Sequence, residues 1–395
     1  MNKHLTIFYA VRNVGGAQLL FARLAAQLQK SCGWKVQLVD YEDGFIRKHF
    51  IKLSIIHDFI VWNDGDKVNL SDTTLLLGFG ELPQALPVFS ANKNVNVLLW
   101  SVHPHNVLAY FRFGFIYRRI PLRLRAKLSS FLEPLTRKKT HLLMDYLNRN
   151  NSLIFMDKPN SLYAQCMFSF QEAKYLAIPI SMETPEINKE RTINKKSISV
   201  GWLGRLDNNK YNSIVASLNS CSMYSEKYDC ELYFHIIGDG AALEKLKNSH
   251  FSGVKLIFPG VLLDDSLSDY LVQNFQVGFA MGTSVLEISK HQIPSVITDY
   301  STKPIPCKEI PYRWFYDSNE LDVGEVYGEV SRKPSISIED ILYVATNKKM
   351  NNLIGKLCAD KAYSEYEIEN VAEKLIDYID SSKSSFSEIK SLLGK

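Results

Sequence analysis

The stretch VGFAMGTSVLEISKHQIPSVITD (Val277–Asp299) is the clearest structural unit in this chain. Two apolar runs enclose a turn of small residues and a short helical segment, which predicts strand, turn, helix and strand. Gly282 allows the backbone of the turn to approach a ligand closely. We expect Thr283 or Ser284 to cap the helix, and Glu287 to lie about one turn into it.

Two interpretations of this turn are open. A strand, a turn, a helix and a second strand occur together in every α/β protein, so Gly282, Thr283 and Ser284 could simply begin a helix. They could also bind an anion, because the N–H groups and the dipole of a helix attract negative charge at its N-terminus. The second interpretation needs support from other stretches of the chain.

The same alternation precedes this stretch in the C-terminal half of the chain. Strands are predicted within Ser197–Lys210, Glu231–Gly240 and Val254–Leu262, and a helix from about residue 211 to 224 follows the first. Strands that alternate with helices form a parallel sheet with helices on both faces. This half is therefore predicted to be a doubly wound domain.

The N-terminal half begins with a strand–helix–strand unit. Leu5–Val11 predicts a buried strand, Ala17–Lys30 predicts a helix with leucines on one face, and Val36–Asp40 predicts a second strand. Further strands are predicted at Asp58–Trp62, Thr73–Gly80 and Val95–Trp100. The Gly15–Gly16 turn lacks the spacing of a dinucleotide fingerprint. Gly16 is either a plain turn residue or part of a loop that faces an acceptor or a diphosphate.

The length of 395 residues predicts two or three domains. The polar run Glu183–Ser197 is typical of a linker. We predict a first α/β domain at 1–185, a second at 186–362 and a C-terminal helix with a tail at 363–395. Apolar residues recur at helical spacing within Tyr366–Ile379, and the serine- and lysine-rich tail after Asp380 is expected to be loosely ordered.

Composition excludes several classes of protein. The hydrophobic content of 46% is that of a folded protein. No apolar run reaches the roughly 18 residues of a membrane span, and no signal peptide is recognisable at the N-terminus. The six cysteines form no CxxC pair, which favours a cytosolic protein without a structural zinc site.

The stretch from Tyr110 to Thr140 is strongly basic and has Glu133 as its only acid. Aromatic and aliphatic residues are interleaved with the basic ones, of which five are singled out as a surface: Arg112, Arg118, Arg119, Arg123 and Arg125. A solvated face would explain only the arginines. Nucleic-acid binding would explain both residue types but has no other support in the chain. We favour attachment to an anionic membrane surface, with a plain basic face as the alternative.

Three glycine turns of the C-terminal half follow predicted strands, so they should meet at one edge of the sheet. They are Gly204–Arg205 with the downstream Lys210, then Gly238, Asp239 and Gly240, and finally Gly282, Thr283 and Ser284 with Glu287. Two cations and backbone N–H groups can hold a diphosphate without a metal, and a carboxylate suits the hydroxyls of a ribose. This pattern predicts a nucleotide-sugar site. The adjacent Asp264 and Asp265 do not form a DxD metal motif and are predicted to lie in a solvated turn.

His103 and His105 follow the strand predicted at Val95–Trp100. Ligands bind beyond the carboxyl ends of strands in open α/β sheets, so either histidine is a candidate for substrate contact. The alternative is a loop histidine that is hydrogen-bonded to the backbone.

Taken together, these motifs resemble the retaining GT-B glycosyltransferases of family 4, in particular bacterial enzymes of surface-polysaccharide assembly. The pieces that carry the resemblance are the turn Gly15–Gln18, the GRL with a downstream lysine at Gly204–Lys210, IIGDG at Ile236–Gly240, FPGVL at Phe258–Leu262 and SVLEISKHQIPSVI at Ser284–Ile297. The resemblance implies two Rossmann-like domains that face a cleft, with a C-terminal helix that crosses back to the first.

The resemblance also implies roles for individual residues. Arg205 and Lys210 would bind the diphosphate, Glu287 the ribose, and His103 would lie near the transferred sugar. The donor would be a UDP-, GDP- or dTDP-linked sugar, with no other cofactor. The acceptor would be a lipid-linked glycan, lipopolysaccharide or capsule precursor at the cytoplasmic face of the inner membrane.

One position departs from the family pattern. The first glutamate of the Glu-x7-Glu motif would fall at position 279, which is a phenylalanine here. In the family that glutamate contacts the donor sugar. Phe279 therefore keeps open a second hypothesis, a non-catalytic GT-B-like subunit that binds a nucleotide or a partner. A third hypothesis is a nucleotide-sugar epimerase.

Overall fold

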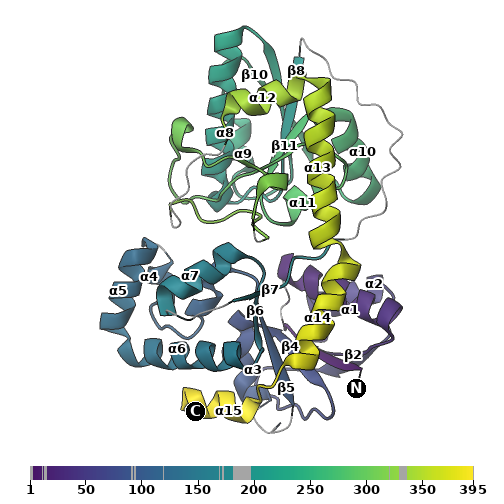
Figure 1. Cartoon of the computed structure of the whole chain (residues 1–395), viewed down its shortest axis with the longest axis vertical. Helices are drawn as coiled ribbons and strands as arrows, with labels where there is room; N and C mark the ends of the chain where they lie inside the picture. The colour runs from purple at the N-terminus through teal and green to yellow at the C-terminus, as the bar shows by residue number, and fades with distance from the viewer. Residues whose placement is uncertain are drawn as a thin grey trace. The chain divides into compact units, whose positions relative to one another are not determined.

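The structure is a computed structural model that describes residues 3–10, 12, 16–89, 92, 95–118, 120–168, 170, 173–180, 197–319, 321–328 and 336–394. Two compact units make up the chain, and each is an α/β layer structure (Figure 1). Unit 1 comprises Met1–Pro179 and Ile368–Lys395, and unit 2 comprises Ile180–Glu367. The linker predicted at Glu183–Ser197 lies almost wholly outside the described residues.

Unit 1 contains a seven-stranded parallel sheet in the order β3-β2-β1-β4-β5-β6-β7. The strands are β1 (His4–Phe8), β2 (Lys35–Asp40), β3 (His57–Val61), β4 (Thr74–Gly78), β5 (Asn96–Ser101), β6 (Leu153–Phe155) and β7 (Lys174–Tyr175). The central strands are buried along their whole length, as in β4. Both faces of this sheet are covered, which explains why its strands are continuous apolar runs.

The helices of unit 1 connect and cover these strands. They are α1 (Gly16–Cys32), α2 (Phe45–Lys52), η1 (Phe79–Glu81), α3 (Leu82–Val88), η2 (Pro104–Leu108), α4 (Gly114–Tyr117), α5 (Leu122–Leu132), α6 (Pro134–Arg149), α7 (Lys158–Phe168), α14 (Ile368–Ser381) and α15 (Phe386–Leu393). The C-terminal helices α14 and α15, yellow in Figure 1, belong to this unit, where α14 packs against α1 and α15 against α6.

The expectation of a loosely ordered tail after Asp380 is wrong. Ser385 caps α15 by accepting a hydrogen bond from the backbone N–H of Glu388. Phe386, Ile389 and Leu393 are buried in the core of unit 1. Their spacing places three apolar side chains on one helical face, and this burial outweighs the polar composition of the segment.

Unit 2 contains a six-stranded sheet in the order β10-β9-β8-β11-β12-β13, which is parallel except for β13. Its strands are β8 (Ser197–Leu203), β9 (Glu231–Ile237), β10 (Val254–Gly260), β11 (Val277–Ala280), β12 (Ser295–Ile297) and β13 (Arg313–Trp314). Its helices are α8 (Asn208–Tyr228), α9 (Leu243–Lys247), α10 (Asp264–Asn274), α11 (Thr283–Ser289), η3 (Cys307–Glu309), η4 (Phe315–Asp317), α12 (Ile338–Thr346) and α13 (Lys348–Tyr366).

The stretch Val277–Asp299 has the predicted order of strand, turn, helix and strand, as β11, α11 and β12. Asp264 and Asp265 are exposed to solvent as predicted, but the predicted turn is wrong, because both residues begin α10. Carboxylates in the first turn of a helix interact favourably with its dipole, which explains their place there. Within the described residues, no helix combines the length and the apolar character that crossing a bilayer requires.

Candidate functional site

Backbone hydrogen bonds join the turns after β8, β9 and β10 into one continuous edge of unit 2. The N–H of Gly204 donates to the carbonyl of Ile237 at 3.0 Å, and that of Leu206 donates to Asp239 at 2.8 Å. The N–H of Gly238 in turn donates to Gly260 at 2.9 Å. Two of the three glycine turns predicted to meet at one edge, Gly204–Arg205 and Gly238–Gly240, therefore do meet there.

Gly238 and Gly240 are required by this contact between backbones. Both have a positive φ, of 138° and 149°. A Cβ atom at Gly238 would lie 2.1 Å from the carbonyl oxygen of Gly204, and one at Gly240 would lie 2.6 Å from that of Leu206. Close packing is thus a sufficient reason for both glycines, with or without a ligand.

Two polar side chains converge on Gly204 from different helices. A Cβ atom at this glycine would lie 3.1 Å from Oγ of Ser284, at the start of α11, and 3.5 Å from Nζ of Lys210, in the first turn of α8. A hydroxyl and an ammonium group therefore flank the same backbone atom. The neighbouring Arg205 is exposed. Unit 2 thus brings together three of the residues predicted to bind the donor.

Lys210 is held in place by the start of its helix. Asp207 is the N-cap of α8, and its carboxylate accepts the backbone N–H of Lys210 at 3.1 Å. Burial lowers the pKa of the Lys210 ammonium and the charge of Arg205 lowers it further, while Asp207 acts in the opposite direction. An ammonium that has lost hydration gains more from a bound anion than an exposed one does.

The turn at Gly282 presents an open face. Gly282 has a φ of 63°, and its N–H donates to the carbonyl of Val323 at 2.7 Å. A Cβ atom there would meet no atom within 4 Å, in contrast to Gly238 and Gly240. The prediction that Thr283 or Ser284 caps α11 is wrong, because both are already inside the helix and Gly282 occupies the cap position.

Glu287 lies on α11, half-buried beside Lys290. The two side chains form an ion pair at 2.5 Å, three residues apart on the helix. The carboxylate is therefore held in one orientation while part of it remains accessible. A pair of ribose hydroxyls can donate to such a carboxylate without displacing the lysine.

Phe279 belongs to the core of unit 2. It is fully buried on β11, and its ring stacks on that of Phe234 at a centroid distance of 5.9 Å. Only Met281 and Gly282 separate β11 from α11. Counting back from Glu287 therefore reaches the buried strand, and the turn is too short to carry a glutamate that could contact a sugar.

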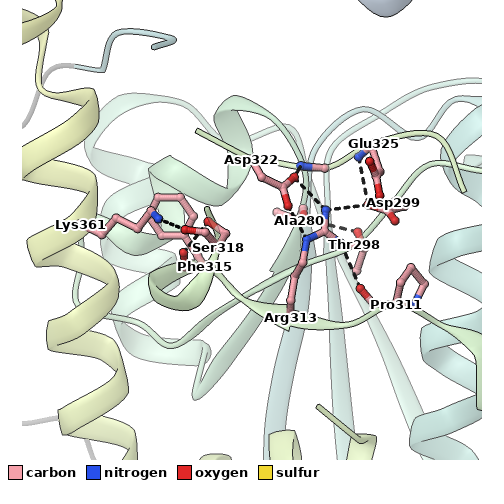
Figure 2. A network of polar contacts seen from close by, with 11 residues as sticks. Ala280, Thr298, Asp299, Pro311, Arg313, Phe315, Ser318, Asp322, Glu325 and Lys361 are labelled. Atoms are coloured by element: carbon pink, nitrogen blue, oxygen red, sulfur yellow. Dashed lines mark hydrogen bonds and ion pairs between the residues drawn. The ribbon is translucent and has the colours of Figure 1, made fainter. Parts of the chain in front are cut away.

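A buried network of ion pairs supports the loop that contacts Gly282 (Figure 2). The sequence did not predict this network. The guanidinium of Arg313 donates to Asp322 at 2.7 and 2.9 Å and to Asp299 at 2.9 Å. It also donates to the carbonyl of Pro311 at 3.0 Å. Burial opposes the positive charge, but Asp299 and Asp322 outweigh this effect and raise the pKa of Arg313.

The network orders the loop that supports the turn. Asp322 accepts the N–H of Gly324 at 2.9 Å, and Asp299 accepts that of Glu325 at 3.0 Å. Between them lies Val323, whose carbonyl holds Gly282. Arg313 therefore fixes the backbone on which the Gly282 turn rests.

The same network is tied to the helix that carries Lys210. Ser213, on α8, donates through its hydroxyl to the carbonyl of Asp299. The N–H of Ser301 donates to the carbonyl of Asn209 at 2.9 Å, and Asn212 donates to that of Ser301 at 3.0 Å. The segment after β12 thus holds the start of α8. Through the bond between Asp299 and the Val323 loop, it also supports the Gly282 turn.

In unit 1, His103 precedes η2 and uses one ring nitrogen locally. Its Nδ1 accepts the backbone N–H of His105 at 3.1 Å, which places the proton of the neutral ring on Nε2. Although His103 is exposed by surface area, desolvation by the surrounding protein lowers its pKa to about 4, and Arg118 contributes in the same direction. The ring is therefore neutral at pH 7. The alternative predicted a loop histidine that is hydrogen-bonded to the backbone, and that bond is present. It still leaves the Nε2–H group of His103 as a donor.

Gly16 is the first residue of α1. The preceding Gly15 lies outside the described residues, so the turn that the two glycines were predicted to form stays a prediction.

The basic stretch of unit 1 is divided by the structure. Arg112 and Arg118 are exposed, whereas Arg119 and the side chain of Arg123 lie outside the described part of the chain. The prediction of Arg125 as a surface residue is wrong. It is fully buried, its guanidinium lies 4.9 Å from the ring centroid of Tyr163, and helical periodicity on α5 turns this position inward.

Large apolar side chains are exposed along the same elements. We call six of them the apolar patch: Phe115, Ile116, Leu124, Phe131, Leu132 and Leu135. Phe131 is 81% exposed and Leu135 is 73% exposed, on the two sides of the junction between α5 and α6. Exposed apolar residues that alternate with cations along neighbouring helices are typical of a surface that binds a membrane or another protein.

Metal-binding residues do not cluster in the part of the chain that the structure describes. There, no three His, Cys, Asp or Glu residues lie close enough together to hold a metal ion.

Comparison with known proteins finds structural likeness alone. No protein-family model and no curated protein matches the chain. TarM of S. aureus is 14% identical over 78% of this chain with a TM-score of 0.47, and this chain spans 55% of TarM. Anabaena Alr3699/HepE in complex with UDP-glucose is 10% identical over 96% of this chain and 99% of HepE, with a TM-score of 0.50.

A glycosyltransferase from Rickettsia africae ESF-5 is 12% identical over 97% of this chain and 99% of its own, with a TM-score of 0.52. At these identities the likeness concerns the fold and not the activity. Two largely parallel α/β sheets flanked by helices, together with likeness over nearly whole chains, show that this protein has the GT-B fold with two Rossmann-like, doubly wound domains.

Proposed function

We propose that the protein is a glycosyltransferase that takes a sugar from a nucleotide-diphosphate donor. The observation that carries this proposal is the convergence of Lys210 and Ser284 on Gly204, beside an exposed Arg205. The open face of the Gly282 turn adds room for a ligand. The GT-B fold agrees with this function, because the solved structures that are similar include a glycosyltransferase and a protein in complex with UDP-glucose.

The proposed chemistry uses the groups of unit 2 to stabilise a leaving diphosphate. Arg205 and Lys210 neutralise the charge that develops on the diphosphate, so the reaction needs no metal ion. Glu287 accepts hydrogen bonds from the ribose. With no turn available for a further glutamate, contact with the donor sugar falls to the segment Met281–Ser284.

Unit 1 would contribute His103 and the acceptor site. Its neutral ring offers Nε2–H to a hydroxyl of the transferred sugar. We propose transfer with retention of configuration to a lipid-linked glycan, lipopolysaccharide or capsule precursor. The apolar patch and the exposed arginines Arg112 and Arg118 support attachment to the cytoplasmic face of an anionic membrane.

A nucleotide panel tests the proposal directly. UDP, GDP and dTDP, each with and without its sugar, are titrated into the protein by calorimetry and by thermal shift. One of them should bind and raise the melting temperature, because a ligand that binds only the folded state stabilises it. Binding of none of the three would contradict the nucleotide-sugar assignment.

An assay of sugar transfer distinguishes the enzyme from a non-catalytic subunit. Release of the nucleoside diphosphate from its sugar in the presence of membrane acceptors supports the enzyme. Tight binding without any release, on any acceptor fraction, would favour the subunit. Conversion of the free nucleotide sugar without an acceptor would favour an epimerase.

A further inference from the structure

A cationic pocket lies in unit 1, away from the residues assigned above. It has a volume of about 400 Å³ and is lined by Ser130, Pro134, Arg137, Lys138, His141 and Phe168, which define the cationic pocket. These residues come from the end of α5, the first half of α6 and the end of α7. The three helices pack against one another within the unit (Figure 1).

Three basic side chains of α6 meet in this pocket without a counter-charge. Among the residues that the structure describes, no carboxylate lies within ion-pair distance of Arg137 or Lys138. Glu133 is the only acid in the stretch from Tyr110 to Thr140, and its two oxygens are used by the backbone N–H groups of Arg112 and Phe113, at 2.9 and 3.1 Å. The pocket therefore keeps a net positive charge.

Two of these side chains also have buried nitrogen atoms without a hydrogen-bond partner. Arg137 donates through Nη2 to the carbonyl of Met167, but its Nε is buried without a hydrogen-bond partner. Nδ1 of His141 is likewise buried without one. A buried polar group with no partner costs free energy, so a ligand that supplies acceptor oxygens would be favoured at this place.

The chemistry of the pocket fits a phosphate group. A guanidinium, an ammonium and an imidazole offer several N–H donors within about one helical turn, and a phosphate has oxygens enough to accept from all three. Phe168 closes one side with an apolar surface.

The surroundings of the pocket point to a phosphate that is carried by a lipid. Phe131 directly follows Ser130, and Leu135 directly follows Pro134, so both are neighbours in sequence of residues that line the pocket. These are the two most exposed side chains of the apolar patch. Their transfer into a bilayer interface would remove apolar surface from water while the cations meet the headgroups.

We infer that the cationic pocket binds the phosphate of an anionic lipid headgroup while Phe131 and Leu135 enter the bilayer interface. The inference rests on the membrane attachment that forms part of the proposed function, and it does not depend on glycosyl transfer.

The test measures binding to vesicles of equal parts phosphatidylglycerol and phosphatidylcholine by co-sedimentation. The double variant Arg137→Gln/Lys138→Gln should bind about tenfold more weakly than the wild type, because charge-assisted hydrogen bonds are lost. The matched control is Arg149→Gln, on the same helix and exposed, where only a surface ion pair with Asp145 is lost. The control should bind within about twofold of the wild type.

A second variant guards against a folding defect, since Arg137 also holds the end of α7. Lys138→Gln removes an exposed side chain alone, and it should still weaken vesicle binding more than Arg149→Gln does. Glycerol 3-phosphate serves as a soluble probe of the phosphate source. It should fail to displace the wild type from vesicles at concentrations that match the lipid, because it lacks the acyl chains.

If the pocket variants and Arg149→Gln weakened vesicle binding equally, the cationic pocket would not be the headgroup site, although membrane attachment could still hold. Displacement by glycerol 3-phosphate at matched concentration would overturn the lipid as the ligand. Failure of the wild type to sediment with these vesicles would contradict membrane attachment itself. Nucleotide titration of the same samples reports separately on the donor site.

Discussion

The edge of the unit 2 sheet and the α5–α6 region of unit 1 differ in whether their basic side chains are paired with carboxylates. In unit 2 the buried Arg313 is saturated by two carboxylates and a carbonyl. In unit 1 the basic groups of α6 face a pocket without a carboxylate partner within the described part of the chain, and Nε of Arg137 is buried without a hydrogen bond.

This difference indicates how each region works. A saturated network keeps a backbone turn in one position before any ligand arrives, which is preorganisation. Buried donors without partners favour a ligand that brings acceptors. The comparison predicts that substitutions in the Arg313 network act mainly on stability, and those in the cationic pocket mainly on binding.

Arg313→Met should have the largest effect. It leaves Asp299 and Asp322 buried without their counter-charge, and the free energy of unfolding should fall by about 3–5 kcal/mol in urea denaturation at pH 7. Because protonation removes the carboxylate charges, the deficit should shrink as the pH is lowered. The triple variant Arg313→Met/Asp299→Asn/Asp322→Asn, which carries no buried charge at these sites, should recover much of the loss. A single variant as stable as the wild type would show that the network is dispensable.

Gly238→Ala and Gly282→Ala form the next comparison. A methyl group at Gly238 meets the Gly204 backbone in addition to an unfavourable φ, so we expect a loss of stability of roughly 2–4 kcal/mol. At Gly282 only the φ cost of about 1 kcal/mol applies. Gly282→Ala should instead weaken nucleotide binding, because its methyl group enters the open face of the turn. Equal melting temperatures of the two variants would contradict the contrast.

Lys210→Met separates binding from stability within unit 2. The lowered pKa means that the folded state binds the ammonium proton less tightly than the unfolded state does, so the charge costs stability at neutral pH. The variant should therefore melt at the same or a higher temperature than the wild type. Its affinity for the nucleotide should fall about tenfold or more, as measured by calorimetry. Lys247→Met, at an exposed lysine of α9, is the control and should change neither quantity.

The smallest expected effect concerns His103. Its pKa is about 4 in the folded state, whereas an unfolded histidine titrates near 6.5. The unfolded state therefore takes up a proton first, and the protein should lose stability as the pH falls from about 6.5 towards 4. His103→Gln should reduce the shift of the urea midpoint between pH 7 and pH 5. An unchanged shift would show that folding does not lower the pKa of this ring.

Local patterns predicted much of the fold. Val277–Ala280, Thr283–Ser289 and Ser295–Ile297 form the strand, helix and strand expected from apolar spacing alone. The errors arose where the same sequence pattern is compatible with either an exposed or a buried segment. Arg125 belongs to a basic run, but helical periodicity buries it, and the polar tail contains three apolar residues that are sufficient to dock α15.

The glycine turns that follow the strands of the C-terminal half predicted Lys210 and Ser284 as residues of one site, and the structure places both beside Gly204. Phe279 stands where the family has a glutamate, and only the structure shows that this position lies within the buried strand β11, because two residues alone separate β11 from α11. A motif with a fixed spacing presumes a fixed loop length, and loops vary more than strands do.

The sequence by itself determined the alternation of strands and helices, since burial periodicity is a property of neighbouring residues. Tertiary structure alone decided which distant charges meet. Asp299, Arg313 and Asp322 come together because β13 runs antiparallel to β12 and returns the chain to the same edge. Within the described residues, Arg137, Lys138 and His141 have no carboxylate partner. The nearby Glu133 is bound instead to the backbone of Arg112 and Phe113, a contact across about twenty residues that no local pattern encodes.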